Sequence, residues 1–178
     1  MEFYDGVMED LDNGHNVDMI FLDLAKAFDS VHHEKLLIKL RQLQIDSRIV
    51  NWIEDYLKNR VQRVQIRGEK SDWLSVHSGV PQGSVIGTKL FLIYINGIHE
   101  GIESKISIFA DETKLRNTVE NVENDSVLER DLSRLERWSE RNGMHFNVDT
   151  CSVLVSCIVD NIVDFKIRRT ITNFMASS

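Results

Sequence analysis

Two short and largely apolar runs in this sequence each end in acidic residues. Residues 19–22 are followed by Asp23, and residues 106–110 are followed by Asp111 and Glu112. Runs of this length are typical of buried strands, because a buried helix needs more residues. Carboxylates at the ends of neighbouring buried strands repel each other unless a cation lies between them. The chain must therefore fold so that these acids either share a cation or lie apart in turns.

Two interpretations of the acidic strand ends follow from the residues alone. In the first, the carboxylates bind Mg²⁺, which accepts one or two carboxylates and completes its shell with waters and substrate phosphates. Two such ions about 3.5–4 Å apart can activate an attacking oxygen and stabilise a leaving oxygen. In the second, Asp23 and Asp29 start or cap the following helix, while Asp111 and Glu112 occupy a turn. The pattern by itself leaves both interpretations open.

Hydrophobic periodicity predicts the elements around these two strands. We expect Ser47 to cap one helix and Asp125 or Ser126 to cap another, and Gly68 to mark a hairpin. A strand, two helices, a hairpin, a helix, a strand, a helix and a strand then follow in order, which favours helices packed on a small sheet. The expected helices cover residues 36–43, 47–57, 85–98 and 125–143, and the further strands cover residues 64–66, 73–76 and 153–155.

Composition indicates a globular protein of the cell interior. The 178 residues include 28 acidic and 21 basic side chains, for a net charge of −7, and 42% are apolar. This balance argues against wholesale disorder. No apolar run approaches the roughly 18–20 residues of a membrane span, so we expect no membrane partner. The acidic N-terminus is unlike a secretory signal, and two cysteines make no disulfide framework. We therefore expect a nuclear or cytoplasmic protein that is not secreted.

Charge is unevenly distributed along the chain. Residues 1–34 hold nine acids and one base, whereas residues 35–73 hold nine bases and five acids. Neighbouring acidic and basic zones suit a site that holds cations and a polyanion together, with Arg60, Arg63 and Arg67 as candidate phosphate contacts. Solvated helix faces would produce the same distribution.

Other candidate sites have less support in the sequence. His32 and His33 lack the further ligands that zinc requires. Ser84 lacks the glycine spacing of a nucleophile elbow, and no triad is evident. The tryptophans fall on apolar faces, and we expect them in the core rather than as stacking platforms: Trp52, Trp73 and Trp138.

Four stretches occur in an order that is typical of one protein family. Residues 21–29 read FLDLAKAFD, residues 78–84 read SGVPQGS and residues 109–115 read FADETKL, followed by NGMHFN at residues 142–147. The first three resemble the palm motifs of reverse transcriptases, and the third resembles the Phe/Tyr-x-Asp-Asp box. Over about residues 1–155 the chain is most similar to reverse transcriptases of LINE-type (non-LTR) retrotransposons.

The resemblance implies an α+β fold, in which the small antiparallel sheet of a right-hand polymerase palm packs against helices. It divides the chain into a partial palm domain, residues 1–155, and a divergent C-terminal tail, residues 156–178. We expect the fingers and thumb to be largely missing. The implied activity is that of an RNA-directed DNA polymerase, which transfers a deoxynucleotide from a dNTP to a primer 3′-hydroxyl. Its partners would be an RNA template, a DNA primer and the dNTP.

The resemblance also assigns site residues. Two Mg²⁺ ions, for which Mn²⁺ could substitute, would be held by Asp23, the Leu24 carbonyl, Asp111 and Glu112, and the three acids would be catalytic. Phe28 corresponds to a bulky gate that meets the 2′ position of the sugar and disfavours ribonucleotides. The incoming nucleotide and the template would lie against a loop in which glycine permits close backbone approach, formed by Pro81, Gln82 and Gly83.

Three positions depart from the family pattern. Glu112 stands where the family has Asp, and a carboxylate misplaced by about 1 Å can lower a rate roughly 10²-fold. Thr88 replaces the usual Pro, and Thr150 replaces a Lys that is thought to assist the leaving pyrophosphate. We therefore expect impaired activity. The alternative is a non-catalytic nucleic-acid- or protein-binding remnant of a retrotransposon. An unrelated two-metal nuclease or phosphatase has no extra His or acid cluster to support it.

Overall fold

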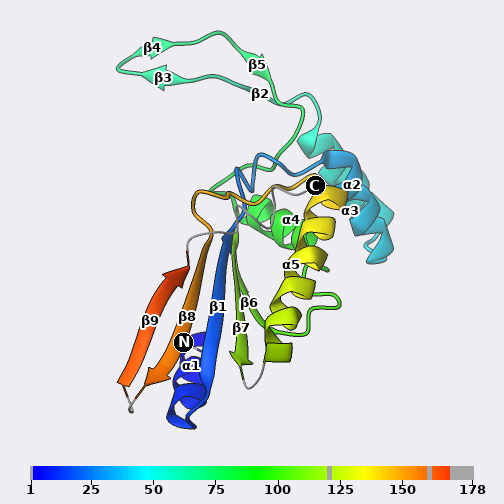
Figure 1. The fold of residues 1–178 in the computed structure, drawn as a ribbon. Helices are drawn as coiled ribbons and strands as arrows, with labels where there is room; N and C mark the ends of the chain where they lie inside the picture. The colour runs from blue at the N-terminus through cyan, green and yellow to red at the C-terminus, as the bar shows by residue number, and fades with distance from the viewer. Residues whose placement is uncertain (1, 120–121, 160–161, 169–178) are drawn as a thin grey trace. The chain divides into compact units, whose positions relative to one another are not determined.

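The computed structural model describes residues 2–119, 122–159 and 162–168 (Figure 1). The chain divides into two compact units. We call Met1–Ala25 together with Gly97–Ser178 the sheet unit, and Lys26–Asn96 the helical unit. The helical unit is thus an insertion between two segments of the sheet unit. No described helix has the length and apolar character needed to cross a membrane.

The sheet unit is built on five antiparallel strands in the spatial order β6-β7-β1-β8-β9. Its central strand, β1, pairs with β7 on one side and β8 on the other, so that four consecutive residues from Val17 to Ile20 are buried. The strands are β1 (Asn16–Asp23), β6 (Lys105–Phe109), β7 (Glu112–Val119), β8 (Ser152–Val159) and β9 (Ile162–Arg168).

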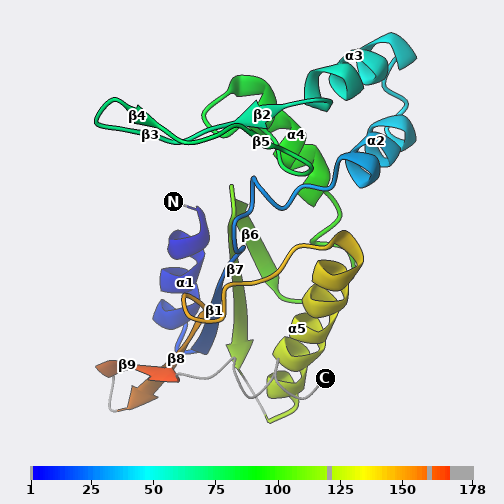
Figure 2. The ribbon, with the colours of Figure 1, turned by 90° about the horizontal axis from the view of Figure 1, so that it is seen from above.

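Two helices, α1 (Glu2–Asp12) and α5 (Val122–Asn142), cover opposite faces of this sheet (Figure 2). On the α1 face, Val7 and Leu11 pack with Val17 and Met19 of β1. Helix α5 packs on β7 and buries an apolar stripe at helical spacing: Leu128, Leu132, Leu135 and Trp138. Alternating β1 side chains therefore supply two cores, one on each face of the sheet.

The helical unit contains α2 (His33–Gln42), α3 (Ser47–Leu57) and α4 (Val85–Ile95). Helix α2 packs against both α3 and α4, and their apolar faces form one core: Leu36, Leu40, Val50, Ile53, Leu57, Leu90, Phe91 and Tyr94. Between α3 and α4 the chain forms a two-stranded arm from four very short strands: β2 (Val61–Gln62), β3 (Gln65–Ile66), β4 (Glu69–Lys70) and β5 (Leu74–Ser75).

The fold confirms the expected mixture of helices with an antiparallel sheet. Both acid-ended runs are strands of one sheet, and the expected helix at residues 47–57 coincides with α3. The expected strand at residues 153–155 lies within β8. Helix α1 and strand β9 were not predicted, although residues 3, 7 and 11 are apolar at helical spacing and residues 163, 165 and 167 are apolar in alternation.

Three local predictions were wrong. Asp46 caps α3 in place of Ser47, because its carboxylate accepts the Arg48 N–H at 2.8 Å. Helix α5 begins at Val122, so a cap at Asp125 or Ser126 is excluded. Trp138 is buried as expected, whereas two of the three tryptophans are exposed because they lie on an outer helix surface and on the arm: Trp52 (52% exposed) and Trp73 (58%).

Candidate functional site

The three predicted acids lie at one end of two paired strands in the sheet unit. Asp23, the last residue of β1, is directly opposite Glu112, the first residue of β7. The next step of the ladder joins Leu24 to Asp111, whose carbonyl accepts the Leu24 N–H at 3.2 Å. Residues almost ninety positions apart therefore meet because β1 and β7 are antiparallel neighbours. All three acids are partly exposed.

Asp111 is held in the tight turn that joins β6 to β7. Phe109 and Glu112 are paired across this hairpin, so Ala110 and Asp111 form its two-residue loop. Ala110 has a φ of +54°, and a positive φ at the first loop position is typical of primed hairpin turns. Such a conformation is strained for a residue other than glycine. The turn thus fixes the backbone of Asp111 beside the end of β1.

The loop after α5 fastens Asp23 from the other side. The Asn147 N–H donates to the Asp23 carbonyl at 2.8 Å, and Leu24 forms a β-bridge with Phe146. Thr150 Oγ1 lies 3.1 Å from Asp23 Oδ2 and 3.0 Å from the Asn147 carbonyl. The hydroxyl is therefore placed to orient the Asp23 carboxylate. In the sequence, Thr150 stood out because it occupies a position where the family has a lysine. Its contact with Asp23 spans 127 positions, so no local sequence pattern could reveal it.

Lys114 brings a positive charge to this group of acids. Its Nζ lies 3.3 Å from Glu112 Oε2 and 3.3 Å from the Tyr4 hydroxyl. Burial disfavours the charged amine, but the hydrogen bonds to Tyr4 and Glu112 outweigh burial and raise the pKa of Lys114. Next to Thr150, burial also raises the pKa of the Cys151 thiol. Lys114 thus remains charged and neutralises part of the carboxylate charge.

The donor set suits a hard divalent cation. Carboxylate oxygens are the ligands that Mg²⁺ prefers, and one or two of them are enough when waters and substrate phosphates complete the shell. Asp23 and Glu112, opposite each other, could supply two. Within residues 2–119, 122–159 and 162–168, no cluster of three or more His, Cys, Asp or Glu side chains could hold a metal ion by itself. The described carboxylates thus suit a divalent cation as part of its ligand shell.

The helical unit brings together the predicted nucleotide-binding residues. The loop of residues 78–83 is tied to the segment that follows β1, since Val80 N–H donates to the Phe28 carbonyl at 2.9 Å and Gly79 N–H to the Val31 carbonyl at 2.8 Å. Gly79 has a φ of +88°, and a Cβ there would lie 2.8 Å from Asp29 Cα. Only glycine permits this approach of the two backbone segments.

The predicted gate, Phe28, is supported from behind by a core residue. Its ring stacks on fully buried Phe91 of α4, with 4.6 Å between the centroids and 20° between the planes. Phe28 itself is partly exposed, as is Pro81, and the loop then turns through exposed Gln82 and Gly83. The structure thus gathers these four residues in one unit and leaves them accessible.

Two basic residues that the sequence did not assign to this loop converge on it. Arg60 Nη1 donates to the Gly79 carbonyl at 2.9 Å, and His33 Nε2 lies 2.8 Å from the same oxygen. This contact accounts for His33, for which the sequence offered only an incomplete zinc site. Both side chains contact the same loop carbonyl, which stabilises the loop conformation.

Comparisons with known proteins agree with the motifs. A family model described as reverse transcriptase (RNA-dependent DNA polymerase) matches residues 5–170. The RNA-directed DNA polymerase from mobile element jockey of Drosophila melanogaster is 27% identical over 154 residues, which are 82% of this chain and 17% of that protein. The probable RNA-directed DNA polymerase from transposon BS, also of Drosophila melanogaster, is 27% identical over 76% of this chain and 16% of that protein.

A solved structure shows the same fold. Apo telomerase from Candida tropicalis superposes with a TM-score of 0.59 over 95% of this chain and 40% of that chain, at 13% identity. The chain spans about 17% of the length of the jockey proteins that it matches. The family model covers far more than half of the chain, and the resemblance inferred from the motifs is confirmed. The chain belongs to the reverse transcriptase (RNA-dependent DNA polymerase) family.

Proposed function

We propose that this chain is the palm portion of an RNA-directed DNA polymerase, which transfers a deoxynucleotide from a dNTP to a DNA primer annealed to an RNA template. The observation that carries the proposal is the backbone pairing that brings Asp23 opposite Glu112, with Asp111 next in the chain, at one end of β1 and β7 in a chain of the reverse transcriptase family. Phosphoryl transfer needs charge neutralisation and in-line positioning more than a protein nucleophile. A group of carboxylates suits that requirement.

In this proposal the acids hold Mg²⁺, or Mn²⁺ in its place. Asp23, Asp111, Glu112 and the Leu24 carbonyl are the proposed ligands, and the bound metal supplies the charge neutralisation for the α-phosphate. Thr150 orients Asp23 through its hydroxyl, at 3.1 Å from Oδ2. Such outer contacts fix the direction of a metal-binding carboxylate.

The helical unit supplies the proposed nucleotide contacts. Gln82 and Gly83 lie against the incoming nucleotide and the template, and Pro81 limits the freedom of the loop. Phe28 excludes a 2′-hydroxyl by overlap, and Phe91 behind it prevents the ring from yielding. The proposed discrimination against ribonucleotides therefore depends on a stacked pair of rings rather than on one exposed side chain.

Primer extension on an RNA template tests the proposal. We expect the chain to extend a DNA primer with dNTPs and Mg²⁺ or Mn²⁺, and Asp23→Asn to lose this extension because it removes a ligand charge and keeps the side-chain size. Asp12→Asn, on an exposed position of α1, is the matched control and keeps the activity. Equal extension by the wild type and Asp23→Asn would refute the catalytic role.

A second candidate function is a non-catalytic remnant that binds nucleic acid or protein. The ion pair of Glu112 with Lys114, at 3.3 Å, favours it, because the lysine competes with a metal for that carboxylate. This candidate predicts no extension, together with salt-dependent binding to an RNA–DNA hybrid that Asp23→Asn leaves unchanged.

A further inference from the structure

We propose that the arm, defined as residues 60–76, binds an unpaired strand of the RNA template. The inference rests on the proposed function, because it names where the RNA partner contacts the helical unit. It adds a binding surface that the acidic site and the residues 78–83 loop do not include.

The arm is a regular hairpin interrupted once. Near its base, Val61 pairs with Ser75 and Gln62 with Leu74; beyond it, Gln65 pairs with Lys70. The register shifts by one residue between these ladders, so the longer side holds one extra residue, as in a β-bulge. At the tip, Arg67 (φ +51°) and Gly68 (φ +94°) form a two-residue turn of the type that hairpins prefer. Backbone pairing thus fixes which side chains lie next to each other.

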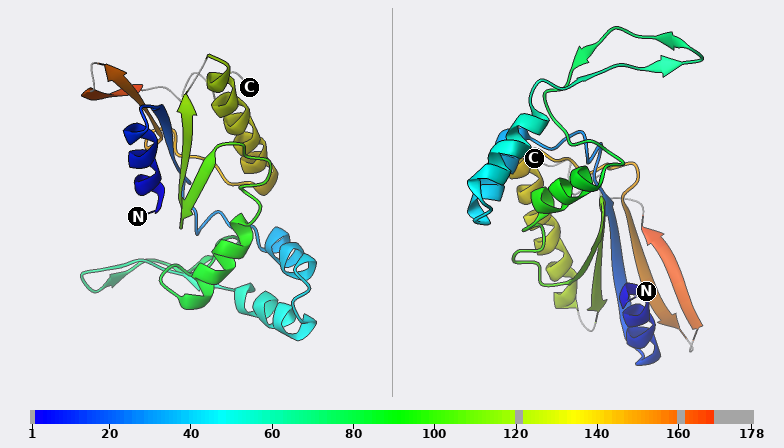
Figure 3. Two further views of the ribbon diagram at one scale, coloured as in Figure 1. Left: turned by 90° about the horizontal axis from the view of Figure 1, so that it is seen from below. Right: turned by 180° about the vertical axis from the view of Figure 1, so that it is seen from behind.

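This hairpin has no core of its own. Every residue from 61 to 75 is exposed, and Figure 3 shows the arm running out from the helices of its unit. An isolated two-stranded ribbon is marginally stable in water. The large apolar side chains on it are nevertheless exposed by more than half: Val61, Val64, Ile66, Trp73 and Leu74. Grouped apolar exposure of this kind marks an interaction surface.

The charge of the arm selects a polyanion as the partner. Within residues 60–76 there are four Lys or Arg residues and two acids, in a chain with 28 acids and 21 bases. Lys58 is paired with Glu54 at 2.7 Å, and Arg60 donates to the residues 78–83 loop. In the described part of the chain, no ion pair engages the bases further along the arm: Arg63, Arg67 and Lys70. Clustered cations that are not in ion pairs with carboxylates favour binding to phosphates.

Trp73 and Arg63 indicate an unpaired strand rather than a duplex. They are cross-strand neighbours, and the Arg63 guanidinium carbon lies 4.4 Å from the centroid of the Trp73 ring. Trp73 is 58% exposed, so its indole retains surface on which a base could stack. Stacking on an aromatic platform needs a base whose face is free, and basic side chains beside it follow the backbone. In a duplex, the neighbouring bases cover these faces.

Fluorescence anisotropy with a short labelled single-stranded RNA tests the inference, using the full chain in EDTA and without dNTPs. We expect Trp73→Ala to weaken binding roughly ten-fold and Trp73→Phe to keep most of the affinity. Trp52→Ala is the matched control, because Trp52 is 52% exposed but lies on α3, stacked on Tyr56. The double substitution Arg67→Gln and Lys70→Gln should make the slope of log K against log salt concentration less steep. We expect the slope to change by about 0.7 for each positive charge removed.

Three results would overturn the inference: no RNA binding by the wild type, equal binding by Trp73→Ala and Trp52→Ala, or an effect of the arm variants on oligomeric state alone. Asp23→Asn should bind the RNA as the wild type does. Absence of primer extension by the wild type, with retained Trp73-dependent RNA binding, would refute the polymerase proposal and leave the arm as an RNA-binding surface. Circular dichroism of each variant shows whether the fold is kept.

Discussion

Asp23 and Glu112 are like charges at directly opposed positions of paired strands, an arrangement that destabilises a sheet. Lys114 forms an ion pair with Glu112. Asp23 is instead contacted by the Thr150 hydroxyl, which carries no charge to offset that of the carboxylate. A divalent cation between the two carboxylates would remove the remaining repulsion. The geometry therefore links metal binding to the stability of the sheet unit, which gives a test that needs no catalysis.

We expect Asp23→Asn to raise the melting temperature in EDTA by about 1–3 °C, because relief of one cross-strand repulsion is worth up to about 1 kcal/mol. Added Mg²⁺ should raise the melting temperature of the wild type and leave that of Asp23→Asn unchanged. Differential scanning fluorimetry measures both. A Mg²⁺ effect of equal size in the two proteins would place the cation elsewhere.

The extra methylene of Glu112 can be tested directly. We expect Glu112→Asp to increase the rate of primer extension, by up to roughly 10²-fold, if the longer side chain misplaces its carboxylate by about 1 Å. The change also weakens the ion pair with Lys114, which frees the carboxylate for a metal. Glu112→Gln, which keeps the length and removes the charge, should extend more slowly than the wild type. Slower extension by Glu112→Asp would show that the site has adapted to glutamate.

At the residue scale, the sequence could locate the acids but not their supports. Asp23, Asp111 and Glu112 follow from apolar runs that end in carboxylates. The hydrogen bond from Thr150 to Asp23 and the stacking of Phe28 on Phe91 depend on how distant segments pack, so no local spacing contains them.

Among the elements, those with a strong period were predictable and those held by long-range contacts were not. Helix α1 illustrates the second kind, because its Gly6 leaves room for the Arg116 guanidinium of β7, where a Cβ would collide with it. Arg116 is buried and pairs with Asp10 at 2.9 Å. The acidic composition of residues 2–12 looked like a solvated segment, whereas one buried arginine on a distant strand anchors it.

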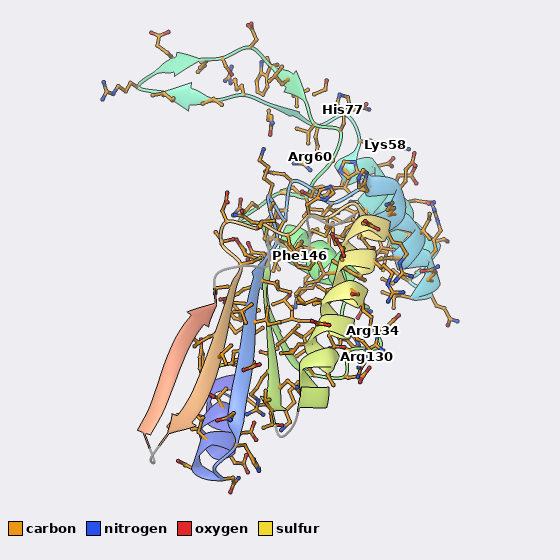
Figure 4. The ribbon with its side chains drawn as sticks, in the orientation of Figure 1. Lys58, Arg60, His77, Arg130, Arg134 and Phe146 are labelled. Carbon is orange, nitrogen blue, oxygen red and sulfur yellow. The ribbon has the colours of Figure 1, made fainter. Side chains whose placement is uncertain are left out.

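Helix α5 is joined to the loop before β6 by a cluster that should respond to acid, in which Arg130 and Arg134 of α5 (Figure 4) contact Glu103. Hydrogen bonds from Arg130, at 2.8 Å, and Arg134, at 2.7 Å, lower the pKa of Glu103 from 4.5 to about 2. A lowered carboxyl pKa contributes stability above the unfolded pKa, and this contribution is lost as the pH falls through the folded pKa. The cluster is solvent-exposed, so the effect is modest.

We therefore expect Glu103→Gln to be less stable than the wild type near neutral pH. The difference should shrink as the pH falls below about 4.5 toward 2, because the wild-type carboxylate becomes protonated. Urea unfolding at a series of pH values measures it. Glu129→Gln, elsewhere on α5, is the control, and a Glu103→Gln deficit that is constant with pH would contradict the assignment.

For the whole molecule, the motifs predicted the family and the mixed antiparallel architecture, and both were confirmed. The division into a palm at residues 1–155 and a tail at residues 156–178 stays a prediction; the family match runs to residue 170, and β9 lies at Ile162–Arg168. Periodicity did not reveal the two units, because the sheet unit is made from segments separated by the whole helical unit.

The helical unit separates the two segments of the sheet unit, and this determines where the chain can accept added residues. Two backbone crossings, after Ala25 and before Gly97, connect the helical unit to the rest. We expect an insertion in an exposed loop within residues 26–96 to leave the Asp23–Glu112 register intact, because closure entropy rises slowly with the size of an intervening loop. The chain between the two acidic motifs can thus grow longer while Asp23 and Glu112 remain opposite each other.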